Sequence, residues 1–283
     1  MASALFGSAR TWLAALAVGF ACATPALAQS DETWNSLKPD IFADRPITDG
    51  ESILEMDAPY RAEDAAVVPI TVRALKPQAG ETAIKAITLV IDENPAPVAA
   101  TVSFGPGAPT ASFSTRLRVN SYSYIRAIAE MNDGSLRMIK KYVKASGGCS
   151  APALKDQDKS VAEMGALRLR QFAQEDVESK TYALAPNDPG AAEAQIMIRH
   201  PNYSGLQMDQ LTRLYIPAHF VRSIELKRGD ALVFKMEGGI SLSEDPSFRF
   251  TFRKDGTGPL IVNAVDTKDN SFGKSWPVER VGS

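Results

Sequence analysis

The sequence predicts an all-β protein of two Ig-like antiparallel β-sandwiches joined by a flexible linker of Gly, Ser and charged residues. Three observations carry this prediction. Short runs of alternating apolar and polar residues recur along most of the chain. Turn sequences such as NDG, GPG and KDG separate these runs, and no long helical pattern lies between them. Many short strands at this spacing are typical of a β-sandwich.

The first predicted sandwich occupies residues 29–144. After a polar segment, its strands are expected at 67–75, 84–92, 97–104, 111–119, 122–131 and 136–144. The sequence MNDGSL, at 131–136, predicts a tight hairpin because Asp-Gly accepts the positive φ angles that such turns need.

A linker or arm is expected at residues 145–163. This stretch is mostly Gly, Ser, Ala, Pro and charged residues, with little apolar surface to bury. It contains Cys149, within the sequence VKASGGCSAP.

The second predicted sandwich occupies residues 164–283. Its strands are expected at 165–172, 192–200, 220–229, 231–239, 247–256, 259–270 and 271–278. The sequence FRFTFRKDGTGPLIVNAVD, at 248–266, predicts another hairpin.

Residues 1–28 are typical of a cleaved secretory signal. Arg10 supplies a positive charge, a short apolar run follows, and ALA at 26–28 predicts cleavage near Ala28. Cys22 would leave with this segment. No later segment has eighteen consecutive apolar residues, and the formal net charge is −2. A periplasmic protein is expected, with neither nucleic acid nor membrane as its partner.

Cys149 would then be a single cysteine in an oxidising compartment, where structural cysteines usually form pairs. An unpaired one indicates a reactive or intermolecular thiol. The alternative is a buried, inert cysteine that packs as a small apolar residue. The neighbours Ser146, Gly147, Gly148 and Ser150 favour the reactive thiol.

No motif predicts a stand-alone enzyme. The two histidines, His200 and His219, lie in the second sandwich, and a cysteine on a mobile strip is poorly held against a catalytic base. The chain has no CxxC or HxxxH spacing for zinc, no haem motif and no nucleotide fingerprint. We therefore expect no cofactor and no metal, and a thiol on a tether is the arrangement that a carrier protein needs.

The motifs resemble those of the SoxYZ sulfur carriers, in the fused form known as the quinoprotein dehydrogenase-associated SoxYZ-like carrier. The SoxY-like sequences are VPITVRA, NPAPVAATVSF, TRLRVNSYSYIRAIAEMNDGSL and KYVKASGGC. The SoxZ-like sequences are HPNYSGL, IPAHFV and FRFTF with VNAVDTKDNSF. By this resemblance, Cys149 holds sulfur intermediates covalently, on a flexible arm that includes Gly147 and Gly148.

The resemblance further implies redox enzymes of the Sox type, or of a quinoprotein dehydrogenase system, as periplasmic partners. This sequence departs from the family pattern in two ways. The residues after the cysteine are SAP and not Gly-Gly, and the chain continues into the SoxZ-like domain. The cysteine must therefore enter a partner as a loop, unless the linker is cut. His200 and His219 match the SoxZ-like motifs. We expect them to fix the loop and the sandwich edge; the alternative is that they make polar contacts near the arm or the partner.

Three functional hypotheses remain open. The first is a non-enzymatic periplasmic carrier that presents a sulfur intermediate of the thiosulfate-oxidation type on Cys149. The second is a binding or assembly module for a quinoprotein dehydrogenase, with Cys149 incidental. The third is a dimer linked by a disulfide at Cys149.

Overall fold

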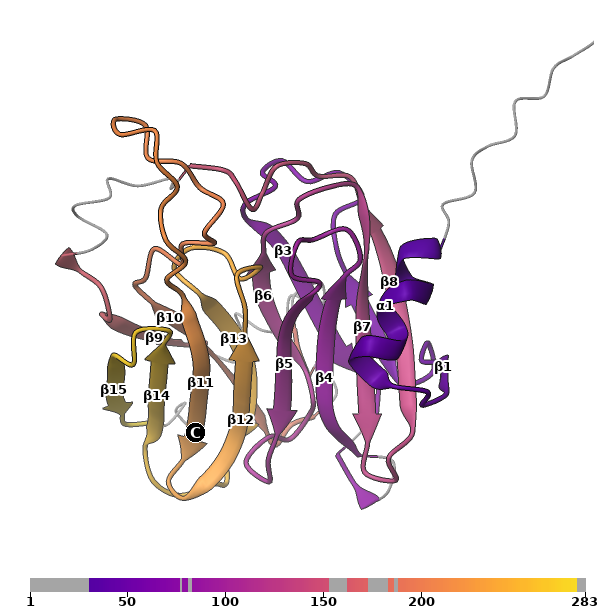
Figure 1. Ribbon diagram of the computed structural model, residues 1–283. Coiled ribbons are helices and arrows are strands. Elements are labelled where there is room, and N and C mark those ends of the chain that lie inside the picture. The colour runs from indigo at the N-terminus through magenta and orange to yellow at the C-terminus, as the bar shows by residue number, and fades with distance from the viewer. Residues whose placement is uncertain are drawn as a thin grey trace, which may run out of the picture.

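The computed structural model describes residues 31–76, 78–80, 83–152, 162–172, 183–185 and 188–278 (Figure 1). The expected signal peptide and Cys22 lie outside these residues, as do residues 153–161 of the expected linker. Export and cleavage near Ala28 therefore stay predictions.

Two sheets form the molecule. The nine-stranded sheet has the order β1-β8-β7-β4-β5-β12-β11-β14-β15. Its strands are β1 (Ile47–Asp49), β4 (Ile84–Ile91), β5 (Val98–Phe104), β7 (Ser123–Met131), β8 (Leu136–Val143), β11 (Val221–Arg228), β12 (Ala231–Gly238), β14 (Leu260–Asp266) and β15 (Ser271–Trp276). The six-stranded sheet has the order β2-β3-β6-β13-β10-β9. Its strands are β2 (Leu54–Asp57), β3 (Val68–Ala74), β6 (Phe113–Leu117), β9 (Leu167–Gln171), β10 (Ala191–Ile198) and β13 (Ser247–Arg253).

The two halves of the chain join edge to edge in both sheets (Figure 1). We define the N-terminal half as residues 31–152 and the C-terminal half as residues 162–278. Strand β5 pairs with β12 in one sheet, and β6 pairs with β13 in the other. The all-β class with two sheets is confirmed, and main-chain hydrogen bonds, in addition to the linker, join the two expected sandwiches.

One apolar core runs through both halves because period-two alternation turns one face of each strand inward. Phe113 of β6 contacts Phe248 of β13, and Phe234 of β12 contacts both Phe248 and Phe250 of β13. These aromatic residues are at most 2% exposed. The joint between the halves is therefore part of the buried apolar core.

The hairpin predicted at 248–266 is wrong. Strand β13 pairs with β10 and β6, whereas β14 pairs with β11 and β15 in the other sheet. The KDGTGP connection crosses from one sheet to the other. Each strand is apolar on its inward face, so facing strands give the same sequence alternation as paired ones. The hairpin predicted at 131–136 is confirmed, with Gly134 at φ +82° between β7 and β8.

An N-terminal helix, α1 (Glu32–Phe42), covers part of the outer face of the nine-stranded sheet (Figure 1). Trp34 and Phe42 are buried there against Val90 and Ile128. Strand β1 pairs in parallel with β8, and β2 pairs with β3. The polar segment before residue 62 thus contains three elements that the sequence did not predict.

Candidate functional site

Cys149 lies on a segment that follows β8, which we call the cysteine strip (residues 145–152). A tight turn covers residues 147–150, and the side chain of Cys149 is completely buried. It is the one cysteine among the residues that the structure describes. The strip lies at the junction of the two halves, and we call the surface that holds it the seat.

The N-terminal half holds the strip by its backbone. Gly147 N donates to Asn120 O at 2.8 Å, and Gly148 N donates to Val119 O at 3.0 Å. A Cβ atom on Gly148 would lie 2.0 Å from Ala65 O, so the backbone approaches more closely than any side chain permits. Gly147 is at φ +80°, with open space around it.

The structure places Gly147 and Gly148 in a seated turn, and their expected role in a flexible arm stays a prediction. The turn uses both glycines for positions that other residues fill poorly, one for its φ angle and one for close approach. In a sequence, a Gly-Gly pair indicates a mobile segment, whereas here the two glycines permit a tightly seated turn.

The C-terminal half closes over the strip through a loop at residues 199–220, which we call the clasp loop. Ser204 Oγ donates to Cys149 O at 2.5 Å, and Gln207 Nε2 donates to Ala151 O at 2.9 Å. Gln207 Oε1 accepts from Ser204 N at 3.1 Å, which orients the two side chains together. Both halves of the chain thus build the seat.

Asn94 fixes the segment beneath the strip. Its Nδ2 donates to Arg118 O at 2.7 Å, and its Oδ1 accepts from Asn120 N at 2.8 Å. Nδ2 also lies 2.9 Å from Ser241 Oγ of the C-terminal half. In the sequence, Asn94 is one residue of a predicted turn, and nothing in that turn indicates that its side chain holds the segment beneath the strip.

Arg118 lies under the seat and is 2% exposed. Its Nη1 donates to Asn202 O at 2.8 Å and to Leu242 O at 2.5 Å, so the charged group binds neutral carbonyls. Among the described residues, its buried Nε has no hydrogen-bond partner. Burial lowers the pKa of the guanidinium below its usual value.

Two opposing effects act on the thiol. Burial, the larger effect, raises the pKa of Cys149, while the charge of Arg118 lowers it. The net shift is upward, so the seated cysteine is a protonated thiol at neutral pH. Since the thiolate is the nucleophile, the seated strip holds the cysteine in an unreactive form.

His200 and His219, both in the clasp loop, come together with Asp266 at the end of β14. His219 Nε2 lies 2.7 Å from Asp266 Oδ2, and His200 Nε2 lies 3.5 Å from the same oxygen. All three side chains are buried. The sequence singled out both histidines but not Asp266, which lies some 47 residues from His219 along the chain.

Burial first, and then the neighbouring His219, lower the pKa of His200 to about 4. Burial alone would raise the pKa of Asp266, but hydrogen bonds from Asn270 and His219 outweigh it and hold that pKa well below the ordinary range. A neutral His200 therefore faces an ionised Asp266.

These three residues have the chemistry of metal ligands, but their hydrogen bonds do not fit a metal. Asn202 N donates to His200 Nδ1 at 3.0 Å, so Nε2 of neutral His200 carries the hydrogen and has no lone pair to offer. Histidine ligands normally donate from the ring nitrogen that does not bind the metal. The cluster instead joins the clasp loop to β14.

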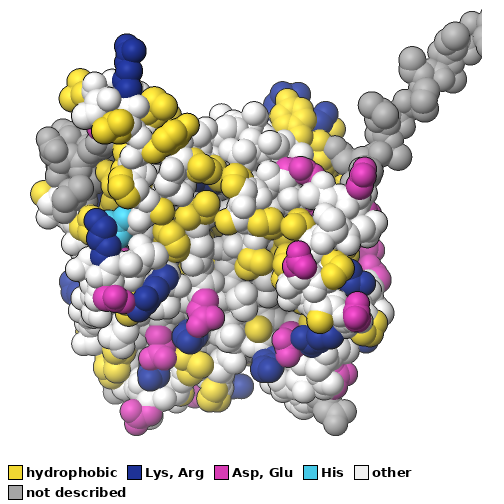
Figure 2. All heavy atoms as spheres, viewed as in Figure 1, with side chains coloured by type: hydrophobic (Ala, Val, Ile, Leu, Met, Phe, Trp, Pro, Cys, Tyr) yellow, Lys and Arg dark blue, Asp and Glu magenta, His cyan; other side chains and the backbone are white. Residues whose placement is uncertain are grey.

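The clasp loop exposes apolar side chains next to the strip, and Figure 2 shows them at the upper left. They are Leu206, Met208, Leu211, Leu214 and Tyr215, with Leu211 94% exposed. A shallow pocket of about 240 Å³ includes Pro152 of the strip and Gln207, Met208 and Leu211 of this loop.

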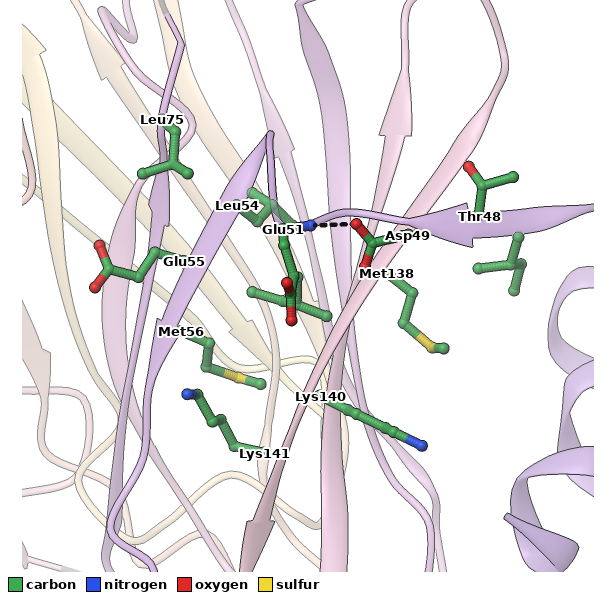
Figure 3. A pocket seen from close by; sticks show the side chains of 12 residues that line it. Thr48, Asp49, Glu51, Leu54, Glu55, Met56, Leu75, Met138, Lys140 and Lys141 are labelled. Carbon is green, nitrogen blue, oxygen red and sulfur yellow. Dashed lines mark hydrogen bonds between the residues drawn. The ribbon is translucent and has the colours of Figure 1, made fainter.

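A second groove, of about 470 Å³, lies elsewhere, between β1, β2 and β8 (Figure 3). Asp49, Glu51 and Glu55 line it together with Lys140 and Lys141. None of the residues that hold Cys149 lines this groove. It is not part of the seat.

The fold is a β-sandwich that holds a cysteine between its two halves, so it defines a thiol-bearing protein. Among the described residues, no catalytic base lies at hydrogen-bond distance from the thiol. Comparison with known families gives the class. Residues 38–149 match the model of the sulfur oxidation protein SoxY, and residues 184–277 match that of the sulphur oxidation protein SoxZ. The chain therefore belongs to the SoxYZ sulfur-oxidation carriers, with both domains fused in one polypeptide. The SoxY match ends at Cys149.

No curated protein sequence matches the chain. Among solved structures, the sulfur carrier protein SoxY from Chlorobium limicola f thiosulfatophilum is 20% identical, with a TM-score of 0.33, over 40% of this chain and 92% of that one. A superoxide reductase (neelaredoxin) variant from Ignicoccus hospitalis, E23A, is 21% identical, with a TM-score of 0.30, over 33% of this chain and 79% of that one.

Proposed function

We propose that the protein carries a sulfur intermediate as a covalent adduct on Cys149 and presents it to redox enzymes in the periplasm. The observation that carries this proposal is the position of Cys149. It is the last residue of the SoxY match, and it lies on a strip that two domains of a sulfur-carrier family hold together.

Loading with thiosulfate joins the Cys149 sulfur to the outer sulfur of thiosulfate. The thiol and thiosulfate give the S-thiosulfonate, one proton and two electrons, and a partner redox enzyme takes the electrons. The seat supplies neither an electron acceptor nor a base, so the chemistry belongs to the partner. On this proposal the chain is a carrier and not an enzyme.

The burial of Cys149 adds a step to the proposal. A completely buried thiol with a raised pKa must leave its seat before it can react. The hydrogen bonds that hold the strip join neutral groups, and each contributes on the order of 1 kcal/mol. We infer that the strip moves between a seated, protected state and a released, reactive state.

The same burial favours one alternative, in which Cys149 is a packing residue and the chain is an assembly module for a quinoprotein dehydrogenase. The two hypotheses differ in whether native protein accepts an adduct. In the carrier, the thiol reacts while the fold stays intact. In the assembly module, it reacts only on unfolding.

The test uses tetrathionate, which loads a thiolate without an enzyme. The thiolate attacks an inner sulfur, forms the S-thiosulfonate and releases thiosulfate. Intact mass spectrometry of folded protein should show one thiosulfonate on the wild type, removed by reductant, and none on Cys149→Ser. Binding of partner enzymes should survive that substitution. An unmodified wild-type protein that loads only in denaturant would overturn the carrier proposal.

A further inference from the structure

We propose that Arg118 makes the seat of Cys149 an anion-binding site, which retains an adduct that ends in a sulfonate better than a neutral adduct. This inference rests on the proposed carrier function and names the chemical class of cargo that the seat favours. Arg118 acts as a positioning residue, because it holds the adduct and takes no part in bond making.

The first observation is a buried charge that forms no salt bridge, although the charge of the Glu244 carboxylate acts on it. No carboxylate lies within salt-bridge distance of Arg118 among the residues that the structure describes, and its Nη1 acceptors are the carbonyls of Asn202 and Leu242. Proteins rarely bury a charge without an opposite one, because desolvation is costly. A buried guanidinium that forms no salt bridge is suited to receive an anion.

The second observation is a donor without an acceptor. Arg118 Nε is buried and has no partner among the described residues, whereas most buried polar groups in proteins have one. Guanidinium groups present their N–H donors in a planar fork that fits oxyanions such as carboxylate and phosphate. A sulfonate presents similar oxygens.

The third observation places this donor beside the thiol. Val119, next to Arg118 in the chain, accepts the hydrogen bond from Gly148, next to Cys149. Asn202, which Arg118 binds, lies two residues before Ser204, which binds Cys149 O. The charge of Arg118 also acts on the thiol directly, since it favours the thiolate. The charge of Arg118 therefore acts on the sulfur of the same seat.

The experiment compares an anionic with a neutral adduct on the full chain. Tetrathionate gives the S-thiosulfonate. Methyl methanethiosulfonate gives the neutral methyl disulfide and releases methanesulfinate. Dithiothreitol, which is uncharged at neutral pH, then removes each adduct, and intact mass spectrometry gives the two release rates. Their ratio, anionic over neutral, isolates the effect of charge from any general loosening of the fold.

We expect Arg118→Gln to raise this ratio by roughly tenfold, the effect of losing one charge-assisted hydrogen bond. Arg118→Lys, which keeps the charge, should raise it less. Arg116→Gln is the matched control, because Arg116 lies two residues away and binds Asp245 O instead. A ratio that is the same in Arg118→Gln and in the wild type would overturn the inference.

A second measurement needs no folded variant. In the ¹H–¹⁵N spectrum of the wild type, the Nε–H signal of Arg118 should move downfield when the thiosulfonate is loaded and stay in place with the methyl disulfide. Equal shifts with both adducts would overturn the inference. If tetrathionate adds nothing to Cys149 of the wild type, the proposed function itself fails. If the adduct forms but the ratio of release rates is the same in Arg118→Gln and in the wild type, only the proposed anion-binding site is overturned.

Discussion

Gly148→Ala is expected to release the cysteine strip and make Cys149 reactive. An alanine Cβ at this position would lie 2.0 Å from Ala65 O and 2.7 Å from Val119 O, both backbone atoms. Neither can move aside as a flexible side chain would, so the strip must rise from its seat. The thiol then meets solvent, and its pKa falls as the burial that raised it is lost.

The magnitude follows from the contacts that the strip loses. Displacing Gly148 breaks at least two hydrogen bonds, Gly148 N to Val119 O and Ser204 Oγ to Cys149 O. At about 1 kcal/mol each, their loss shifts the equilibrium towards the released strip by roughly 2 kcal/mol, or about 30-fold. Gly147→Ala is the matched control. It costs only the strain of positive φ, about 1 kcal/mol or about fivefold.

The assay is the rate at which the native protein reacts with 4,4′-dithiodipyridine, an uncharged thiol reagent. We expect wild type to react far more slowly than free cysteine, with Gly147→Ala slightly faster and Gly148→Ala fastest. Circular dichroism checks that all three stay folded. A wild-type rate equal to that of free cysteine, or equal rates for the two alanine variants, would refute the seated strip.

Three further predictions follow from the same contacts. Ser204→Ala leaves the Cys149 carbonyl without its donor and should raise thiol reactivity at least fivefold, since an unsatisfied buried acceptor costs about 1–3 kcal/mol; Ser150→Ala, an exposed control, should not. Below pH 6.5 the unfolded chain protonates His200, but the folded chain does so only near pH 4. The free energy of unfolding should therefore fall by up to about 3 kcal/mol between these values, as measured by urea denaturation. His200→Gln should flatten this fall, and an unchanged slope would contradict it. Cutting the chain at a protease site inserted after Pro152 should leave the two halves together in gel filtration, because both sheets cross the joint; separate peaks would contradict the shared sheets.

Period-two alternation predicted most strands of this fold, because a sandwich buries one face of every strand. Alternation carries no information about which strand lies beside which. Strands β13 and β14 are adjacent in sequence, but they belong to different sheets. For the same reason, the sequence did not predict the pairing of β5 with β12. Through this pairing the two expected domains share a sheet. Such pairing depends on edges that meet only in three dimensions.

The site was predicted in its chemistry but not in its conformation. Cys149 is identifiable from sequence as an unpaired thiol between small residues. The burial of Cys149 is not identifiable from sequence, because the groups that hold the strip come from distant segments, at Val119, Ser204 and Gln207. In the sequence, Arg118 is one polar residue of an alternating strand. Only the fold shows that it is buried without a salt bridge and that its charge acts on the thiol.

The α1 helix shows a third kind of limit. Its sequence is mostly polar and includes Pro39, so little in it predicts a helix. Two aromatic residues, Trp34 and Phe42, are nevertheless buried against the sheet. Arg126 lies 4.5 Å from the Trp34 ring and pairs with Asp31 just before the helix. Tertiary contacts of this kind override weak local preference.

The most direct test of the account is the intact mass of the protein isolated from cells that are oxidising thiosulfate, measured before and after reductant beside Cys149→Ser. We predict a mass increase by sulfur, sulfonate or thiosulfonate on the wild type that reductant removes, and none on the variant. A free, unmodified Cys149 from such cells would contradict the carrier function and favour the assembly module.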